Sequence, residues 1–160
     1  MQAFLDHCSE LPIENFANGT VLLPEGATTD LVYILAEGRI EILRGNTQVA
    51  VLDEPGGPVG EMSILLGIPH TATARALGDI KVHVIENAAA FFRGHPELSW
   101  LVARLLAGRL NAATTYLVDL TRQFAGSGDH LEMVGEVLES LIHQQEREFH
   151  PGSDRDPGRG

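Results

Sequence analysis

The stretch that decides the fold is residues 60–76, GEMSILLGIPHTATARA. It follows a Gly/Pro loop, PGGPVG (55–60), and predicts a short helix that begins near Glu61. The first N–H groups of a helix have no internal partner and carry the positive end of the helix dipole, which favours an anion. Gly60 would let that anion approach the backbone because it has no Cβ. The stretch therefore predicts an anion-binding turn that leads into a β-strand.

Glu61 is the unusual residue of this turn. A carboxylate beside a bound phosphate repels it, unless the carboxylate accepts a hydrogen bond from another part of the ligand. A ribose 2′-hydroxyl is such a donor, because an ionised carboxylate only accepts. The alternative is that Glu61 is a first-turn acid that stabilises its helix by about 0.3–1 kcal/mol.

The sequence around this stretch is typical of a β-protein. Short runs at 20–23, 31–36, 39–43, 48–52, 71–77 and 80–86 have the composition and length of strands. Glu37-Gly38, Gly45-Asn46 and Gly78-Asp79 separate pairs of runs and can supply the positive φ of two-residue hairpin turns. Many short strands with regular turns predict an antiparallel sandwich or barrel.

After Asn87 the hydrophobic period changes from that of a strand to that of a helix. Pro96 can begin a helix, and the seam that follows has alternating spacings of three and four, which is typical of a coiled coil. We predict a homodimer interface at Leu106, Leu110, Ala113, Leu117, Leu120 and Phe124. Packing of this stripe onto the β-domain is the alternative. A shorter accessory helix is expected at 129–148, followed by a disordered tail at 149–160.

Composition argues against several classes of partner. The formal net charge is -11, the only lysine is Lys81, and no arginine cluster is present, so nucleic-acid binding by this chain alone and binding to an anionic membrane are disfavoured. The single cysteine, Cys8, favours a reducing compartment, and no signal peptide or membrane span is recognised, so a cytoplasmic location is expected. His7 and Cys8 are both expected at the surface.

The stretch resembles the phosphate-binding cassette of the cyclic-nucleotide-binding domain family, which includes catabolite activators and protein kinase A regulatory subunits. That pattern is roughly Gly-Glu-apolar-small-Leu, a loop, Pro-Arg, Ser/Thr/Ala, Ala, Thr. The corresponding residues here are Gly60-Glu61-Met62-Ser63-Ile64 and Pro69-His70-Thr71-Ala72-Thr73. The resemblance covers about residues 10–125, and the opening strands match at Phe16, Gly19, Gly26, Tyr33, Ile34, Gly38 and Ile40.

The resemblance implies an antiparallel eight-stranded jelly roll with flanking helices, followed by a long C-terminal helix and a shorter one. The lead-in would be 1–15 and the domain with its long helix 16–125. It implies that Gly60, Met62 and Ser63 donate to a cyclic phosphate, that Glu61 holds the ribose 2′-hydroxyl, and that His70, Thr71 and Ala72 complete the ligand site. Cyclic AMP or cyclic GMP is the candidate ligand, and Thr71 favours cyclic GMP slightly.

His70 is where the chain departs from the family, because the phosphate-pairing arginine aligns with it. Arginine is always charged and binds two phosphate oxygens at once, whereas histidine at neutral pH is mostly uncharged. Three interpretations stay open: a weak, pH-sensitive phosphate donor, a pocket for another ligand, or a vestigial pocket. Arg75 lies at an odd offset from His70, so we expect it on the opposite face.

Other classes of function have less support. The seven histidines lack the His-x-His pattern of metal-dependent jelly-roll enzymes, so we expect neither a metal site nor an enzyme. If Gly78-Asp79 is a two-residue turn, His83 pairs with Ala74 and lies about 13 Å from His70. The residues after Phe124 are too few for a winged helix-turn-helix. We therefore predict a regulatory cyclic-nucleotide-binding domain with an unknown effector, or alternatively a ligand-free dimerisation or interaction module with the same fold.

Overall fold

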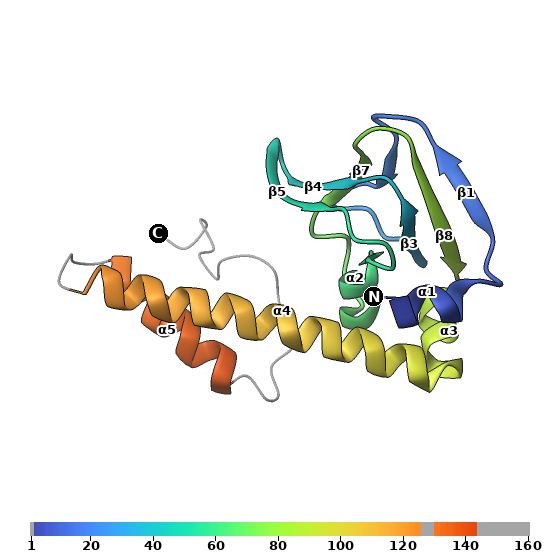
Figure 1. The fold of residues 1–160 in the computed structure, drawn as a ribbon. Coiled ribbons are helices and arrows are strands. Elements are labelled where there is room, and N and C mark those ends of the chain that lie inside the picture. The colour runs from blue at the N-terminus through green and yellow to red at the C-terminus, as the bar shows by residue number, and fades with distance from the viewer. Residues whose placement is uncertain (1, 126–129, 144–160) are drawn as a thin grey trace, which may run out of the picture. The chain divides into compact units, whose positions relative to one another are not determined.

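The computed structural model describes residues 2–125 and 130–143 and consists of two antiparallel sheets with flanking helices (Figure 1). The strands are β1 (Ile13–Phe16), β2 (Val21–Leu23), β3 (Leu31–Glu37), β4 (Ile40–Arg44), β5 (Thr47–Leu52), β6 (Pro58–Val59), β7 (Thr73–Ala76) and β8 (Ile80–Glu86). The helices are α1 (Gln2–Cys8), α2 (Glu61–Leu66), α3 (Ala88–Gly94), α4 (Pro96–Gln123) and α5 (His130–His143). The chain divides into two units inside α4, after Arg104.

The core of the first unit lies between the two sheets, whose strand orders are β1-β8-β3-β6 and β2-β7-β4-β5. Side chains of a strand alternate between its two faces, and β7 shows this clearly. Ala74 and Ala76 are buried, whereas Thr73 and Arg75 are only half-buried. This is the eight-stranded jelly roll that the resemblance implied, and it agrees with the antiparallel sandwich or barrel that the strand pattern predicted. The apolar residues that form the core are Leu22, Leu23, Tyr33, Leu35, Ile40, Val59, Ala74, Ala76, Ile80, Val82 and Val84.

Only one of the three predicted hairpin turns joins two paired strands. Gly45-Asn46 connects β4 to β5, where Arg44 pairs with Thr47. Glu37-Gly38 and Gly78-Asp79 instead connect strands of different sheets, since β3 pairs with β6 and β8, and β7 pairs with β2 and β4. The hairpin prediction was wrong at these two places because a glycine turn fixes the local bend and not the sheet that the next strand joins.

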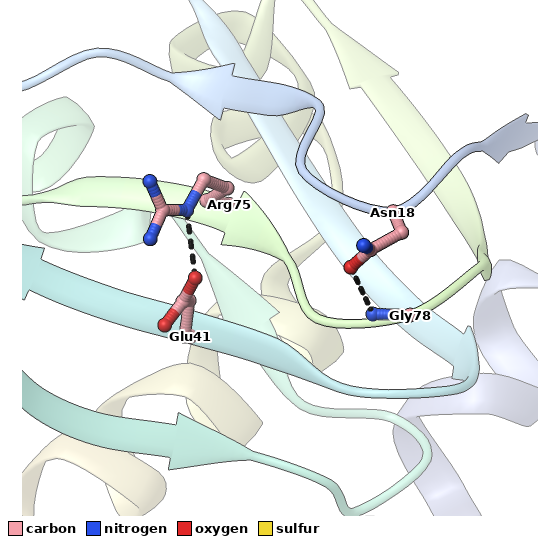
Figure 2. Close-up of polar contacts among 4 residues, drawn as sticks. All are labelled: Asn18, Glu41, Arg75 and Gly78. Atoms are coloured by element: carbon pink, nitrogen blue, oxygen red, sulfur yellow. Dashed lines mark hydrogen bonds and ion pairs between the residues drawn. The ribbon is translucent and has the colours of Figure 1, made fainter.

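The turn after β7 is held by the segment that precedes β2. The Gly78 N–H donates to Asn18 Oδ1 at 2.8 Å (Figure 2). The Asn18 N–H donates to Asp79 Oδ1 at 3.1 Å. After this turn, β8 belongs to the other sheet. His83 pairs with Ile13 and Ile34, not with Ala74 as the hairpin prediction required.

The sequence patterns missed two strands. The sequence of β1, IENF, does not alternate between apolar and polar residues, and β6 has only two residues. Cys8 also differs from expectation, because its side chain is fully buried at the end of α1. Burial raises the pKa of the Cys8 thiol to about 11.

Helix α4 begins at Pro96, as predicted, and extends over 28 residues. Leu98 and Val102 are its buried residues and belong to the first unit. Along the predicted dimer seam, Leu106, Leu117 and Leu120 are half-buried, whereas Leu110, Ala113 and Phe124 are exposed. Within residues 2–125 and 130–143, no helix has both the length and the apolar character that a membrane span requires. The predicted tail at 149–160 lies outside the described residues.

Candidate functional site

Gly60 begins the candidate site and connects β6 to α2. Its φ is 94°, in the left-handed region that glycine adopts without strain. A Cβ at this position would lie 2.8 Å from both the Leu31 carbonyl oxygen and Leu23 Cδ1. Only glycine therefore fits at this position, which lets α2 begin directly against the jelly roll.

Helix α2 starts at Glu61, as the sequence predicted, and ends at Leu66, after which Gly67 has a φ of 65°. Glu61 is 3% exposed and Ser63 is 7% exposed, whereas Met62 is 43% exposed. The Ser63 hydroxyl donates to the Gly60 carbonyl oxygen at 3.4 Å. The structure thus brings the Glu61 and Ser63 side chains inward and leaves the Met62 side chain in solvent.

His70 lies beside Ser63 and is 4% exposed. Its ring nitrogens both have hydroxyl partners: Nδ1 lies 2.7 Å from Ser63 Oγ, and Nε2 lies 2.7 Å from Thr29 Oγ1. Its backbone is held as well, because its N–H donates to the Ala27 carbonyl and its carbonyl accepts from the Gly26 N–H. His70 therefore joins α2 to the loop between β2 and β3.

Burial lowers the pKa of His70 below its ordinary value. Removing an imidazolium from water disfavours the charged form, so the ring is neutral at neutral pH. It then has one N–H donor in place of the permanent charge and paired donors of an arginine. This position supplies hydrogen bonding but no fixed positive charge.

Thr71 and Ala72 follow His70 and are both half-buried, so they extend the site toward β7. At the start of β7, the Thr73 hydroxyl oxygen accepts from the Glu25 N–H at 3.0 Å. Sequence analysis did not identify Thr29 as part of the site. Nothing in the sequence around Thr29 marks it, because its partner lies 41 residues away and the contact depends on the tertiary fold.

Arg75 does not replace the missing arginine. It pairs directly with Glu41 across β7 and β4, and its Nε–H donates to the Glu41 carboxylate at 2.7 Å (Figure 2). Glu41 is 8% exposed, so this partner holds Arg75 on the outer face of the sheet, away from the inward-facing Ala74 and Ala76.

The sequence of residues 13–93, just over half of the chain, matches the Cyclic nucleotide-binding domain family. The chain belongs to the cyclic-nucleotide-binding domain family. A curated relative, the CRP-like cAMP-activated global transcriptional regulator of Mycobacterium tuberculosis, is 28% identical over 112 residues. That match covers 66% of this chain and 50% of the relative, so the chain spans about half the length of the curated relatives it matches first.

Solved structures share the fold of this chain. The Thermus thermophilus Catabolite Activator Protein superposes with a TM-score of 0.59 at 23% identity, covering 94% of this chain and 88% of that chain. PKAR CBD2 with Sp-2Cl-cAMPS bound superposes with a TM-score of 0.54 at 21% identity, covering 69% of this chain and 71% of that chain. At these identities the likeness shows the fold alone.

Within this cyclic-nucleotide-binding domain, Gly60, Glu61 and Ser63 lie together at the start of α2, and His70 contacts Ser63. Among the described residues, no three His, Cys, Asp or Glu side chains gather as a metal ion would require. The chemical capacity of this site is therefore hydrogen bonding by hydroxyl groups, backbone N–H groups, a neutral imidazole and one buried carboxylate.

Proposed function

We propose that this chain is a regulatory domain that binds a cyclic nucleoside monophosphate weakly at the cassette and signals through its C-terminal helices. The observation that carries the proposal is the grouping of Gly60, Glu61 and Ser63 around the start of α2, with His70 in contact. Family membership makes a cyclic nucleotide the first ligand to test.

Glu61 supports the ligand class. It is 3% exposed, and its carboxylate can accept a hydrogen bond from a ribose 2′-hydroxyl. We propose that it recognises the ribose, while the backbone N–H groups of Met62 and Ser63 donate to the cyclic phosphate. We further propose that Thr71 favours cyclic GMP.

His70 is the reason to expect weak binding. Loss of one partner of a buried charge pair costs roughly 2–5 kcal/mol, which corresponds to about 30-fold to several thousand-fold in affinity. A neutral imidazole can recover only part of that loss, through a single hydrogen bond that requires it to give up one of its present partners, Ser63 or Thr29.

The alternative is a ligand-free interaction module with the same fold. The specific observation in its favour is that both ring nitrogens of His70 already have partners within the protein, Ser63 and Thr29. A ring that is fully hydrogen-bonded in this way offers no donor to a phosphate.

The deciding experiment follows backbone amide NMR signals of residues 60–72 during titration with cyclic AMP and cyclic GMP to millimolar concentration. We expect saturable shifts of these signals, a larger response to one of the two nucleotides, and loss of the response with the 2′-deoxy analogue or with Glu61→Gln. The absence of any response from these signals to either nucleotide would support the ligand-free module instead.

We also propose that the chain forms a homodimer through α4, along the seam Leu106, Leu110, Ala113, Leu117, Leu120 and Phe124. Leu110 is 50% exposed and Phe124 is 54% exposed, so a second copy has apolar surface to cover. In sedimentation velocity we expect a dimer, a monomer for Leu110→Asp, and a dimer for the matched off-seam variant Thr115→Asp. A monomeric wild type, or dissociation by both variants alike, would contradict this interface.

A further inference from the structure

His70 has a hydroxyl group on each side of its ring. Ser63 Oγ lies 2.7 Å from Nδ1 and belongs to α2, while Thr29 Oγ1 lies 2.7 Å from Nε2 and belongs to the loop between β2 and β3. The ring is 4% exposed, so these two hydroxyls, and not water, decide where its proton lies.

The proton positions depend on which partner receives the single Ser63 hydroxyl proton. One candidate acceptor is the Gly60 carbonyl oxygen at 3.4 Å, and the other is His70 Nδ1 at 2.7 Å. In the arrangement that keeps the bond to Gly60, Ser63 Oγ accepts from His70 and the ring proton lies on Nδ1. In a neutral imidazole the other nitrogen, Nε2, is then an acceptor, and the Thr29 hydroxyl donates to it.

We propose that Thr29 is a positioning residue of the cassette: its hydroxyl donates to Nε2 and, together with Ser63, fixes His70 as the Nδ1–H tautomer with no N–H left for a ligand phosphate. Thr29 lies outside the cassette motif and acts only through His70. Its role in ligand affinity rests on the proposed function, whereas its effect on the imidazole does not.

This arrangement has a definite consequence for a ligand. A phosphate oxygen accepts hydrogen bonds and cannot donate to Nε2, so it gains nothing from His70 while Thr29 occupies that nitrogen. For His70 to bind phosphate, Nε2 must acquire a proton and the Thr29 hydroxyl must give up its place as donor. Thr29 therefore acts as a competitor of the ligand for one ring nitrogen.

The first test reads the tautomer directly. Long-range nitrogen–proton NMR at about pH 8, well above the ordinary histidine pKa of about 6.5, distinguishes a protonated ring nitrogen from an acceptor nitrogen. His70→Gln identifies the His70 signals by their disappearance. We expect wild type to carry its proton on Nδ1, Thr29→Val to shift the Nε2 signal to that of an unbonded acceptor, and Thr29→Ser to restore it.

Ser63→Ala is the matched variant on the other side of the ring. It removes the acceptor of the Nδ1 proton, so we expect the proton to move to Nε2 and be accepted by Thr29. A proton on Nε2 in wild type, or unchanged ring nitrogen signals in Thr29→Val, would overturn the proposal. The general folding of each variant is monitored by its backbone amide spectrum.

The second test is ligand affinity. We expect Thr29→Val to bind the preferred cyclic nucleotide roughly fivefold more tightly than wild type, the size of one net hydrogen bond, and Thr29→Ser to resemble wild type. Unchanged affinity in Thr29→Val would overturn the competition. If no variant binds a nucleotide while the tautomers follow expectation, the proposed ligand is wrong and the positioning role of Thr29 stands.

Discussion

Arg75 lies directly opposite Glu41 on the neighbouring strand and donates its Nε–H to the Glu41 carboxylate at 2.7 Å. The Glu41 side chain is 11% exposed and that of Arg75 is 41% exposed, so the pair lies at the edge of solvent. The arginine nearest to His70 in the sequence is therefore already paired with a carboxylate of the neighbouring strand. We therefore expect Arg75 to affect the stability of the sheet and not the charge beside His70.

Arg75→Met should lower stability without changing ligand binding. The substitution leaves a nearly buried carboxylate without this partner, and we expect the free energy of unfolding to fall by about 1–2 kcal/mol. Urea unfolding measures this change, and nucleotide titration of the folded variant provides the comparison. A large loss of nucleotide affinity in a folded Arg75→Met protein would mean that Arg75 reaches the ligand after all.

The central part of the fold was predictable from the sequence because it depends on local patterns. Residue composition and the positions of Gly and Pro predicted the start of α2 at Glu61 and the start of α4 at Pro96. They also predicted the runs that form β2, β3, β4, β5, β7 and β8. The pairing of strands is a long-range property. The turns at Gly38 and Gly78 therefore resembled hairpins and instead carry the chain between sheets.

The candidate site was predictable in its motif and not in its contacts. Gly60, Glu61, Ser63 and His70 are neighbours in sequence and came from one pattern. Thr29 reaches His70 because its loop lies beside the segment that follows α2, where Gly26 and Ala27 bond to the backbone of His70. Cys8 shows the same limit, since burial at the end of α1 cannot be read from a seven-residue helix.

Gly60→Ala should be much more damaging than Gly67→Ala. Both glycines have positive φ, 94° and 65°, so both substitutions incur the backbone cost of roughly 1 kcal/mol. At Gly60 the new Cβ would also lie 2.8 Å from the Leu31 carbonyl oxygen, whereas at Gly67 nothing lies within 4 Å. Thermal unfolding of the two variants measures the difference. Equal losses of stability would show that the contact with Leu31 relaxes at no cost.

His70 should make stability fall as the pH falls. Its pKa in the folded protein is lowered by burial, so the unfolded chain binds the proton more tightly than the folded chain does. The resulting stability is fully present above the unfolded pKa of about 6.5 and is lost as pH falls from there through the lower folded pKa. One proton contributes at most about 1.4 kcal/mol per pH unit.

The measurement is urea unfolding across this pH range for wild type and for His70→Gln, whose amide can still bond to both hydroxyls. Between neutral and acidic pH, we expect the free energy of unfolding to decrease less in the variant than in wild type. Parallel pH profiles for the two proteins would show that His70 does not bind its proton differently in the folded and unfolded states.

The central claim is that the cassette is intact and lacks only the charge at residue 70. Calorimetric titration of wild type and His70→Arg with cyclic AMP and cyclic GMP tests it most directly, with Arg75→Met as the control for a distant arginine. We predict that His70→Arg, folded as judged by its amide spectrum, binds one cyclic nucleotide at least about 30-fold more tightly than wild type. A folded His70→Arg protein that binds neither nucleotide more tightly than wild type would contradict the account.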